Sequence, residues 1–299
     1  MWETRVTRLL GCKYPLIQGA YHSFGRAEIA AAVSNTGAFG IITAGALRTP
    51  ERVREEIARA RQITDKPFGV NITLSIVPNP ESMLDAILDA GVRIVFTAAN
   101  RPEALGRRIH EAGAVWVHKV ATVRHAMAAE KAGADAVVIV GIEGAGHKNP
   151  TQVTTLINIP LAVRNIRIPI IAAGGIGDAR GFMSALSMGA EAAYVGTAFI
   201  ATEECPAAPR YKQLILDGWP YDARLRGPAF APPDAGLVER MRRGETMDAE
   251  SITDEDFEGS PISSLPSLAV GLIDQVVPVQ SFVEGIIGGA EEIRRRWAL

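Results

Sequence analysis

The sequence predicts a (β/α)8 barrel, the TIM-barrel fold, followed by a variable C-terminal insertion and closing helices. The chain has 299 residues, 47% of them hydrophobic, which suits a single large core of this kind. Short apolar runs alternate with longer amphipathic segments over residues 15–199. The apolar runs lack strict polar alternation, as expected for strands that are buried on both faces of a parallel sheet. An open doubly wound sheet is the competing arrangement, and eight strand–helix units favour the barrel.

The predicted strands follow one another at the spacing that βα units require. They are PLIQGA (15–20), FGIITAG (39–45), FGVNIT (68–73), RIVFTAA (93–99), AVWVHKV (114–120), DAVVIVG (135–141), IPIIAAGG (168–175) and AAYVGTAF (192–199). Helical segments between them include residues 26–37, 49–63 and 122–134. Several of these end in glycine, which takes a left-handed C-cap without steric cost. Pro50 and Pro80 each suit the first turn of a helix.

The pattern changes after the eighth unit. We expect a barrel over residues 1–219, a loop or lid insertion over 220–266, and C-terminal helices over 267–299 that pack back on the barrel. The insertion is dense in Pro, Gly and charge, with one short helix expected around residues 235–244. The apolar faces of the closing helices are compatible with a homodimer.

Composition narrows the classes of function. A net charge of −2 and a pI near 6.2 leave no basic footprint for nucleic acid. Neither a signal peptide nor an apolar run long enough to span a membrane is evident. Cys12 and Cys205 are the only cysteines, too few for a disulfide framework, and no metal-ligand spacing is present. We therefore expect a cytoplasmic protein that acts on a small molecule and binds no metal.

The ends of the last two predicted strands indicate a phosphate site. Gly174 and Gly175 end the seventh strand, and Gly196 and Thr197 lie in the eighth run. Glycines let backbone N–H groups approach an anion closely, and the threonine hydroxyl adds a donor. The loops after strands seven and eight commonly hold phosphate in such barrels. Tight turns alone would also explain single glycines, but the pairs occur at both expected positions.

Three further strand ends carry polar residues that could serve chemistry. Asn71 could read the edge of a heterocycle or simply cap a loop, and Lys119 could lie beside an electron-rich ring or on the surface. His147 follows Gly146 in the turn GIEGAGH, where the glycine would let a ring come close. Imidazole titrates near neutrality, which suits removal of a proton from a carbon acid. A satisfied polar residue at a strand end is the alternative for His147.

Taken together, these segments resemble the nitronate monooxygenase (2-nitropropane dioxygenase) family of FMN-dependent barrels. The similarity is nearly collinear from about residue 5 to 215 and includes RAEIAAAVSNTGAFG, TDKPFGVNITL, VHKVATVRHAMAAEKAGADAV, GIEGAGH, IPIIAAGGIGDARGFMSALSMGA and GTAFIATEEC. AVGLIDQV near the C-terminus also looks like the closing segment of the family.

The resemblance implies an FMN at the C-terminal mouth of the barrel. Its phosphate would lie on Gly174, Gly175, Gly196 and Thr197, and its ring would contact Gly19, Ala20, Asn71 and Lys119. His147 matches the active-site histidine of the family, which would remove the α-proton of a neutral nitroalkane. The implied reaction is oxidation of alkyl nitronates with O2. Relatives in the same superfamily instead use NADH or NADPH to reduce quinones, or reduce enoyl or CoA thioesters, and residues 151–156 look like that thioester branch.

Departures from the family pattern lie around the substrate side. Tyr21 and His22 stand where the family usually has a methionine and its neighbour, and Lys148 begins KNP in place of the common PGE. These three residues are therefore predicted to contact substrate, and they favour a larger or anionic one. They also leave room for a hypothesis of another class, a non-catalytic barrel that binds a phosphate-bearing ligand.

Overall fold

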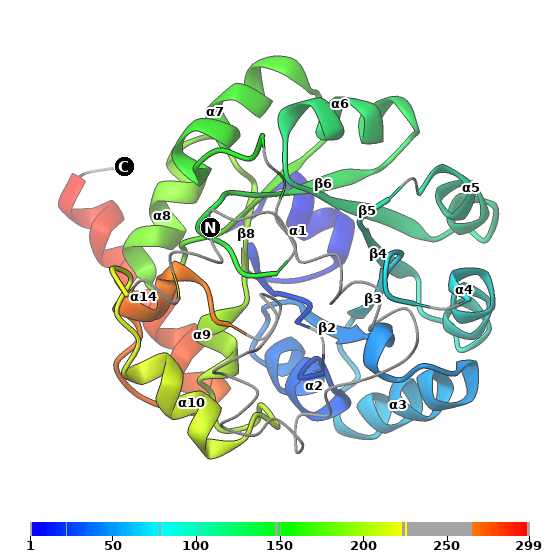
Figure 1. The fold of residues 1–299 in the computed structure, drawn as a ribbon, viewed down its shortest axis with the longest axis horizontal. Coiled ribbons are helices and arrows are strands. Elements are labelled where there is room, and N and C mark those ends of the chain that lie inside the picture. The colour runs from blue at the N-terminus through cyan, green and yellow to red at the C-terminus, as the bar shows by residue number, and fades with distance from the viewer. Residues whose placement is uncertain are drawn as a thin grey trace.

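The computed structural model describes residues 2–21, 23–77, 79–100, 102–146, 149, 151–222, 225 and 265–297. Within these ranges, eight parallel strands form a nearly closed barrel with helices between them (Figure 1), which confirms the predicted (β/α)8 fold. The strands are β1 (Leu16–Gln18), β2 (Gly40–Thr43), β3 (Phe68–Thr73), β4 (Ile94–Ala98), β5 (Val115–Val120), β6 (Ala136–Val140), β7 (Ile170–Ala173) and β8 (Ala192–Val195).

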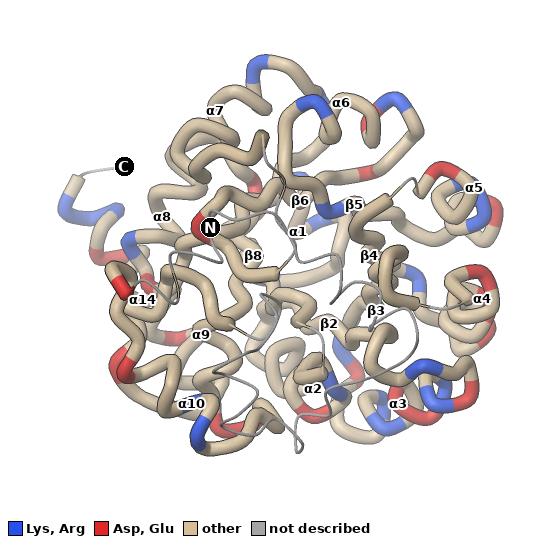
Figure 2. Tube along the Cα trace, viewed as in Figure 1, with Lys and Arg blue, Asp and Glu red and all other residues tan. Residues whose placement is uncertain are grey.

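Helices connect the strands and cover the outside of the barrel. They are α1 (Arg5–Leu10), α2 (Ala27–Asn35), α3 (Pro50–Ile63), α4 (Pro80–Asp89), α5 (Glu103–Glu111), α6 (Val123–Lys131), α7 (Thr155–Asn165), α8 (Ala179–Ser187), α9 (Thr197–Ile200), α10 (Pro209–Leu216) and α14 (Val279–Trp297), with short 3-10 helices η1 (Ala44–Ala46) and η3 (Leu268–Leu272). The charges of α3 and α4 lie on the outer ring of Figure 2, whereas the strands are mostly uncharged.

Local sequence signals account for many helix boundaries. Pro50 and Pro80 begin α3 and α4, as predicted. The Thr49 hydroxyl accepts a hydrogen bond from the Arg52 N–H at the start of α3. Gly11 ends α1 in the left-handed conformation with φ of 70°, the geometry that glycine adopts without strain.

The predicted end of the eighth strand is wrong, and the second strand also ends earlier than predicted, at Thr43, where η1 follows. The eighth apolar run was expected to be a strand over residues 192–199, but β8 ends at Val195 and Thr197–Ile200 form α9. The residues of α9 are all buried. A short segment that is buried on every side carries no polar periodicity, so its composition cannot distinguish a strand from a helix.

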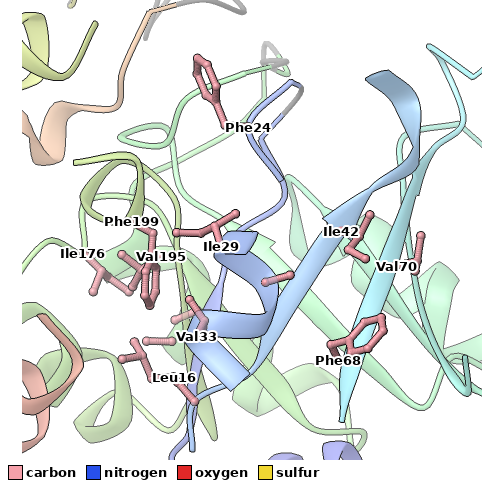
Figure 3. Packing of buried hydrophobic residues seen from close by; sticks show 14 of the residues in the cluster. Leu16, Phe24, Ile29, Val33, Ile42, Phe68, Val70, Ile176, Val195 and Phe199 are labelled. Carbon is pink, nitrogen blue, oxygen red and sulfur yellow. The ribbon is translucent and has the colours of Figure 1, made fainter. Parts of the chain in front are cut away.

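Successive side chains of each strand point alternately into the barrel and toward the helices, and they form two separate hydrophobic clusters. Side chains such as Phe39, Phe96 and Val117 fill the inside of the barrel, and Val6 and Leu10 of α1 join them. The larger cluster lies between strands and helices. Figure 3 shows part of it, with Val33 of α2 beside Leu16 of β1 and Ile42 beside Val70 on neighbouring strands. The buried barrel interior supports the polar residues at the strand ends.

The barrel closes between β1 and β2 through a side chain as well as backbone. The Gln18 N–H donates to the Phe39 carbonyl at 2.9 Å, and the Phe39 N–H donates to the Leu16 carbonyl at 2.9 Å. The side-chain amide of Gln18 forms the next two hydrogen bonds between these strands. Its Oε1 accepts from the Ile41 N–H at 2.9 Å, and its Nε2 donates to the Ile41 carbonyl at 3.1 Å. Gln18 is fully buried and acts here like one more residue of strand.

The C-terminal α14 packs against α8 and α2. The short helix expected around residues 235–244 lies outside the described residues. No helix in the described ranges is both long enough and apolar enough to cross a membrane.

Candidate active site

The predicted site residues that the structure describes lie at the carboxyl ends of the strands. Gly19 follows β1, Asn71 and Lys119 lie near the ends of β3 and β5, and Gly174 and Gly196 follow β7 and β8. In a parallel barrel these ends meet at one mouth. The fold therefore brings together residues that are separated by more than a hundred positions in sequence.

The loop after β1 is held by a tyrosine that sequence reasoning missed. Tyr194 of β8 is buried inside the barrel, and its hydroxyl accepts a hydrogen bond from the Ala20 N–H at 2.6 Å. A Cβ on Gly19 would lie 2.9 Å from the Tyr194 ring, so only glycine fits there. Tyr21 lies next to the β8 loop, 3.7 Å from where a Cβ on Gly196 would be. The β1 and β8 loops thus pack together at the mouth.

Asn71 is almost completely buried and shares the inner face of β3 with Thr73. Its Oδ1 accepts a hydrogen bond from the Thr73 hydroxyl at 3.0 Å, which sets the orientation of the amide. The Nδ2 group has no partner among the described residues. The structure therefore leaves an oriented amide donor available at the mouth.

Lys119 places a positive charge at the mouth without a counter-charge. Its Nζ lies 5.5 Å from the centroid of the Tyr194 ring. Within the described ranges, no carboxylate forms an ion pair with it. Burial lowers the pKa of Lys119 to about 8, because the ammonium loses hydration that nothing replaces. A half-buried cation of this kind favours an anionic or electron-rich ligand.

His118, the neighbour of Lys119, points to the other side of the strand and is structural. Its Nδ1 lies 2.8 Å from the Thr97 hydroxyl oxygen, which also accepts from the Trp116 indole N–H at 2.7 Å. Burial lowers the pKa of His118 to about 4, so the imidazole is neutral near pH 7. Because successive side chains of β5 point to opposite faces, Lys119 lies in the site and His118 lies between the strands and the helices.

The β7 loop presents unpaired backbone donors. Gly174 and Gly175 have φ of 99° and 75°, which side-chain-bearing residues rarely adopt. Gly174 packs so closely on the β6 loop that a Cβ would lie 3.0 Å from the Gly141 carbonyl oxygen. In the described part of the chain, the N–H groups of Gly174, Gly175 and Gly196 donate to no acceptor. Three half-buried donors at two adjacent loops suit an anion such as phosphate.

The hydroxyl of Thr197 is engaged with a residue that the sequence did not indicate. Thr197 Oγ1 donates to Ser267 Oγ at 2.8 Å and accepts from the Ser267 N–H at 3.0 Å. Both residues are buried, and they are seventy positions apart in sequence. No local motif around Ser267 distinguishes it from an ordinary loop serine, so only the fold reveals its position.

A second network that sequence reasoning missed orders the β6 loop. The Glu143 carboxylate accepts from the Thr155 N–H at 3.0 Å and from the Thr155 hydroxyl at 3.0 Å. The same hydroxyl lies 2.9 Å from the Gly174 carbonyl oxygen. The carboxylate at the start of α7 is also favoured by the helix dipole. Glu143 therefore ties the β6 loop, α7 and the β7 loop together.

The remaining predicted residues divide into described and undescribed ones. Gly146 has φ of 87°, and no atom of the described residues lies within 4 Å of where its Cβ would be. His147, His22 and Lys148 lie outside the described residues. Among the described residues, no three His, Cys, Asp or Glu side chains cluster in a way that could hold a metal ion.

The described residues fit a flavin nucleotide. The β7 and β8 loops offer unpaired N–H groups for a phosphate. Lys119 and Asn71 offer a cation and an amide donor for the polar edge of a ring. The Tyr21 hydroxyl oxygen is buried and has no partner within the described part. These orphaned groups share one mouth, as the binding site of a ring joined to a phosphate requires.

Comparison with known proteins identifies the class and then the family. A (β/α)8 barrel with unpaired donors for a phosphate and a ring at one mouth is compatible with a flavin-dependent oxidoreductase, and the family match establishes that class. The family model of nitronate monooxygenase matches residues 3–83 and 78–220. The chain therefore belongs to the nitronate monooxygenase family, and it is an enzyme of this flavin-dependent class. The hypothesis of a non-catalytic barrel is not supported.

Similar proteins carry different names within this class. A (3aS,4S,5R,7aS)-5-hydroxy-7a-methyl-1-oxo-octahydro-1H-indene-4-carboxyl-CoA dehydrogenase of Mycobacterium tuberculosis is 34% identical over 81% of this chain and 69% of its own length. A probable nitronate monooxygenase of Staphylococcus aureus strain MSSA476 is 28% identical over 92% of this chain and 90% of its own. FabK from Thermotoga maritima is 33% identical with a TM-score of 0.83, covering 99% of this chain and 98% of the other.

Proposed function

We propose that this enzyme is an FMN-dependent oxidoreductase that oxidises alkyl nitronates with O2. The observation that carries the proposal is Lys119, a half-buried ammonium beside Tyr194 with no counter-charge among the described residues. A bound FMN would supply the acceptor for the two electrons of the substrate. The ammonium would stabilise the negative charge that reduction places at the polar edge of the ring.

Other residues of the chain have separate roles in this proposal. The free Nδ2 of Asn71 donates to the same polar edge and orients it. The N–H groups of Gly174, Gly175 and Gly196 bind the phosphate. His147 removes the α-proton of a neutral nitroalkane, a step that a preformed nitronate does not need.

A second candidate on the same scaffold is reduction of an enoyl or CoA thioester by NADH or NADPH. The similarity to a CoA dehydrogenase and, over the whole chain, to FabK favours it. Tyr21, His22 and Lys148 would then contact the larger substrate. In both candidates electrons pass through the ring at the same mouth, and only the donor and acceptor differ.

The discriminating experiment is anaerobic reduction of the purified holoprotein. We expect an alkyl nitronate to bleach the oxidised-flavin absorption, and readmission of air to restore it. Bleaching by NADH or NADPH, with recovery on adding an enoyl-CoA, would instead establish the thioester reductase. With a neutral nitroalkane, His147→Ala should retain flavin and lose bleaching, and an unchanged rate would refute the proposed base.

A further inference from the structure

The segment that precedes α14 lies across the loops that carry the phosphate donors. The Leu268 N–H donates to the Glu143 carbonyl of the β6 loop at 3.0 Å. A Cβ on Gly177, in the loop after β7, would lie 3.1 Å from the Leu272 Cβ. The 3-10 helix η3 also packs against α9, next to the β8 loop. Residues from the far end of the chain therefore form part of the candidate site.

Ser267, the N-cap residue of η3, has one hydrogen left to donate. Its Oγ accepts from the Thr197 hydroxyl at 2.8 Å and from the Ala269 N–H at 3.3 Å. Its own N–H donates to Thr197 Oγ1 at 3.0 Å. Each hydroxyl carries a single hydrogen, and that of Thr197 is directed to Ser267. The hydroxyl hydrogen of Ser267 therefore has no acceptor among the described residues, although the residue is only 8% exposed.

The surroundings of this hydroxyl favour an anion as the missing acceptor. Through Thr197, Ser267 lies beside Gly196, whose N–H is unpaired. Through Leu268 it is joined to Glu143, and Gly175 lies so close that its Cβ would be 3.3 Å from Glu143 Cβ. The Glu143 carboxylate itself is already occupied by two donors of α7. The unpaired groups identified around Ser267 in the described part, the N–H groups of Gly175 and Gly196, are thus donors.

We propose that the Ser267 hydroxyl donates a hydrogen bond to the phosphate of FMN, and that Thr197 acts through it. This inference rests on the proposed FMN cofactor. Thr197 positions Ser267, because its hydroxyl links the N–H and the Oγ of the same serine. In this proposal Ser267, rather than Thr197 as expected from the sequence, is the residue whose hydroxyl binds the phosphate directly.

The test compares FMN with riboflavin, which has the same ring and no phosphate. Apoprotein is prepared from the full chain, and each flavin is titrated by fluorescence quenching. The wild type should bind FMN more tightly than riboflavin. Ser267→Ala should weaken FMN about 10- to 100-fold, the range for a hydrogen bond to a charged group, and leave riboflavin unchanged. Ser267→Thr, which keeps the hydroxyl, should retain FMN affinity and show that the site tolerates substitution.

A matched control and a double variant test whether the loss of FMN affinity is specific to Ser267 and whether Thr197 acts through it. Thr202→Val removes another fully buried hydroxyl, which donates to the Phe199 carbonyl, and should not alter the ratio of FMN affinity to riboflavin affinity. Thr197→Val should weaken FMN, and adding it to Ser267→Ala should cause no further loss, because both act through one hydrogen bond. Fully multiplicative losses would show that Thr197 binds the phosphate directly and would overturn the relay.

The two proposals fail in different ways. A wild type that binds neither flavin would refute the proposed function. A wild type that prefers FMN, with Ser267→Ala equally selective, would refute the role of Ser267 alone. Equal weakening of FMN and riboflavin by Ser267→Ala would assign the serine to packing and would also overturn the inference.

Discussion

At the scale of single residues, the site is defined by groups whose partners are missing. Lys119 and Asn71 each present a polar group at the mouth that forms no hydrogen bond or ion pair in the described part, and the buried Tyr21 hydroxyl has no hydrogen-bond partner there. His118 shows the contrast, because its burial is compensated by the Thr97 hydroxyl. Uncompensated polar groups cost stability, so their gathering at one mouth indicates a ligand.

The buried charge of Lys119 predicts a pH-dependent penalty in the apoprotein. Its folded pKa of about 8 lies below the unfolded value of about 10.4, so the unfolded chain binds more protons between these values. The penalty is complete below about pH 8 and is relieved as the pH rises toward 10.4. We expect apo Lys119→Met to be more stable than the wild type at pH 7, by at most about 3 kcal/mol, and less so at pH 10.

Urea unfolding of both apoproteins at the two pH values measures this difference. Lys131→Met, which changes an exposed lysine of α6, is the control and should show little effect at either pH. If Lys119→Met increased the free energy of unfolding equally at both pH values, the gain would come from packing rather than from removal of the charge.

At the scale of elements, short contacts explain where glycine is required. Gly288 and Gly289 are neighbours in α14, but only Gly289 faces α8, where a Cβ would lie 2.7 Å from Ala179 Cβ. Among the described residues, no atom lies within 4 Å of a Cβ on Gly288. This contact fixes how closely the closing helix approaches the barrel.

Alanine at these two positions should have opposite effects. Gly288→Ala should stabilise the protein by about 0.5–1 kcal/mol, because alanine loses less conformational freedom than glycine in a helix. Gly289→Ala should destabilise it by about 1–3 kcal/mol, because neither backbone nor Ala179 can move aside cheaply. Denaturant unfolding of both variants tests the pair, and stabilisation by Gly289→Ala would show that α14 is not held against α8 as described.

At the scale of the whole molecule, the side-chain amide of Gln18 supplements the two backbone hydrogen bonds that close the barrel between β1 and β2. Gln18 supplies both hydrogen bonds to the Ile41 backbone at the only gap in the ladder of described strands. Gln18→Met keeps the volume but leaves the buried N–H and carbonyl of Ile41 unpaired, and should destabilise the protein by about 2–5 kcal/mol.

Urea unfolding and hydrogen exchange of the Ile41 amide measure the effect. Gln213→Met removes an exposed amide of α10 that donates to Asp217, and serves as the control with little expected change. Slow exchange at Ile41 in Gln18→Met would mean that β1 and β2 close without the side chain.

Much of the fold was predictable because its signals are local. Buried parallel strands produce uninterrupted apolar runs, and β3 spans the predicted residues 68–73. Proline and threonine at the start of α3 act within one helical turn. The end of β8 was not predictable, since α9 is buried on all sides and its sequence lacks polar periodicity.

The sequence by itself determined the order of strands and helices, the family, and the strand ends that carry Gly19, Asn71, Lys119 and the paired glycines. Each of these depends on residues that are adjacent in the chain. Only the tertiary structure decided that Tyr194 supports the β1 loop and that Ser267 meets Thr197 across seventy positions. Such partners are chosen by proximity in space, where unpaired donors and acceptors must be satisfied, and no local pattern in the chain encodes that proximity.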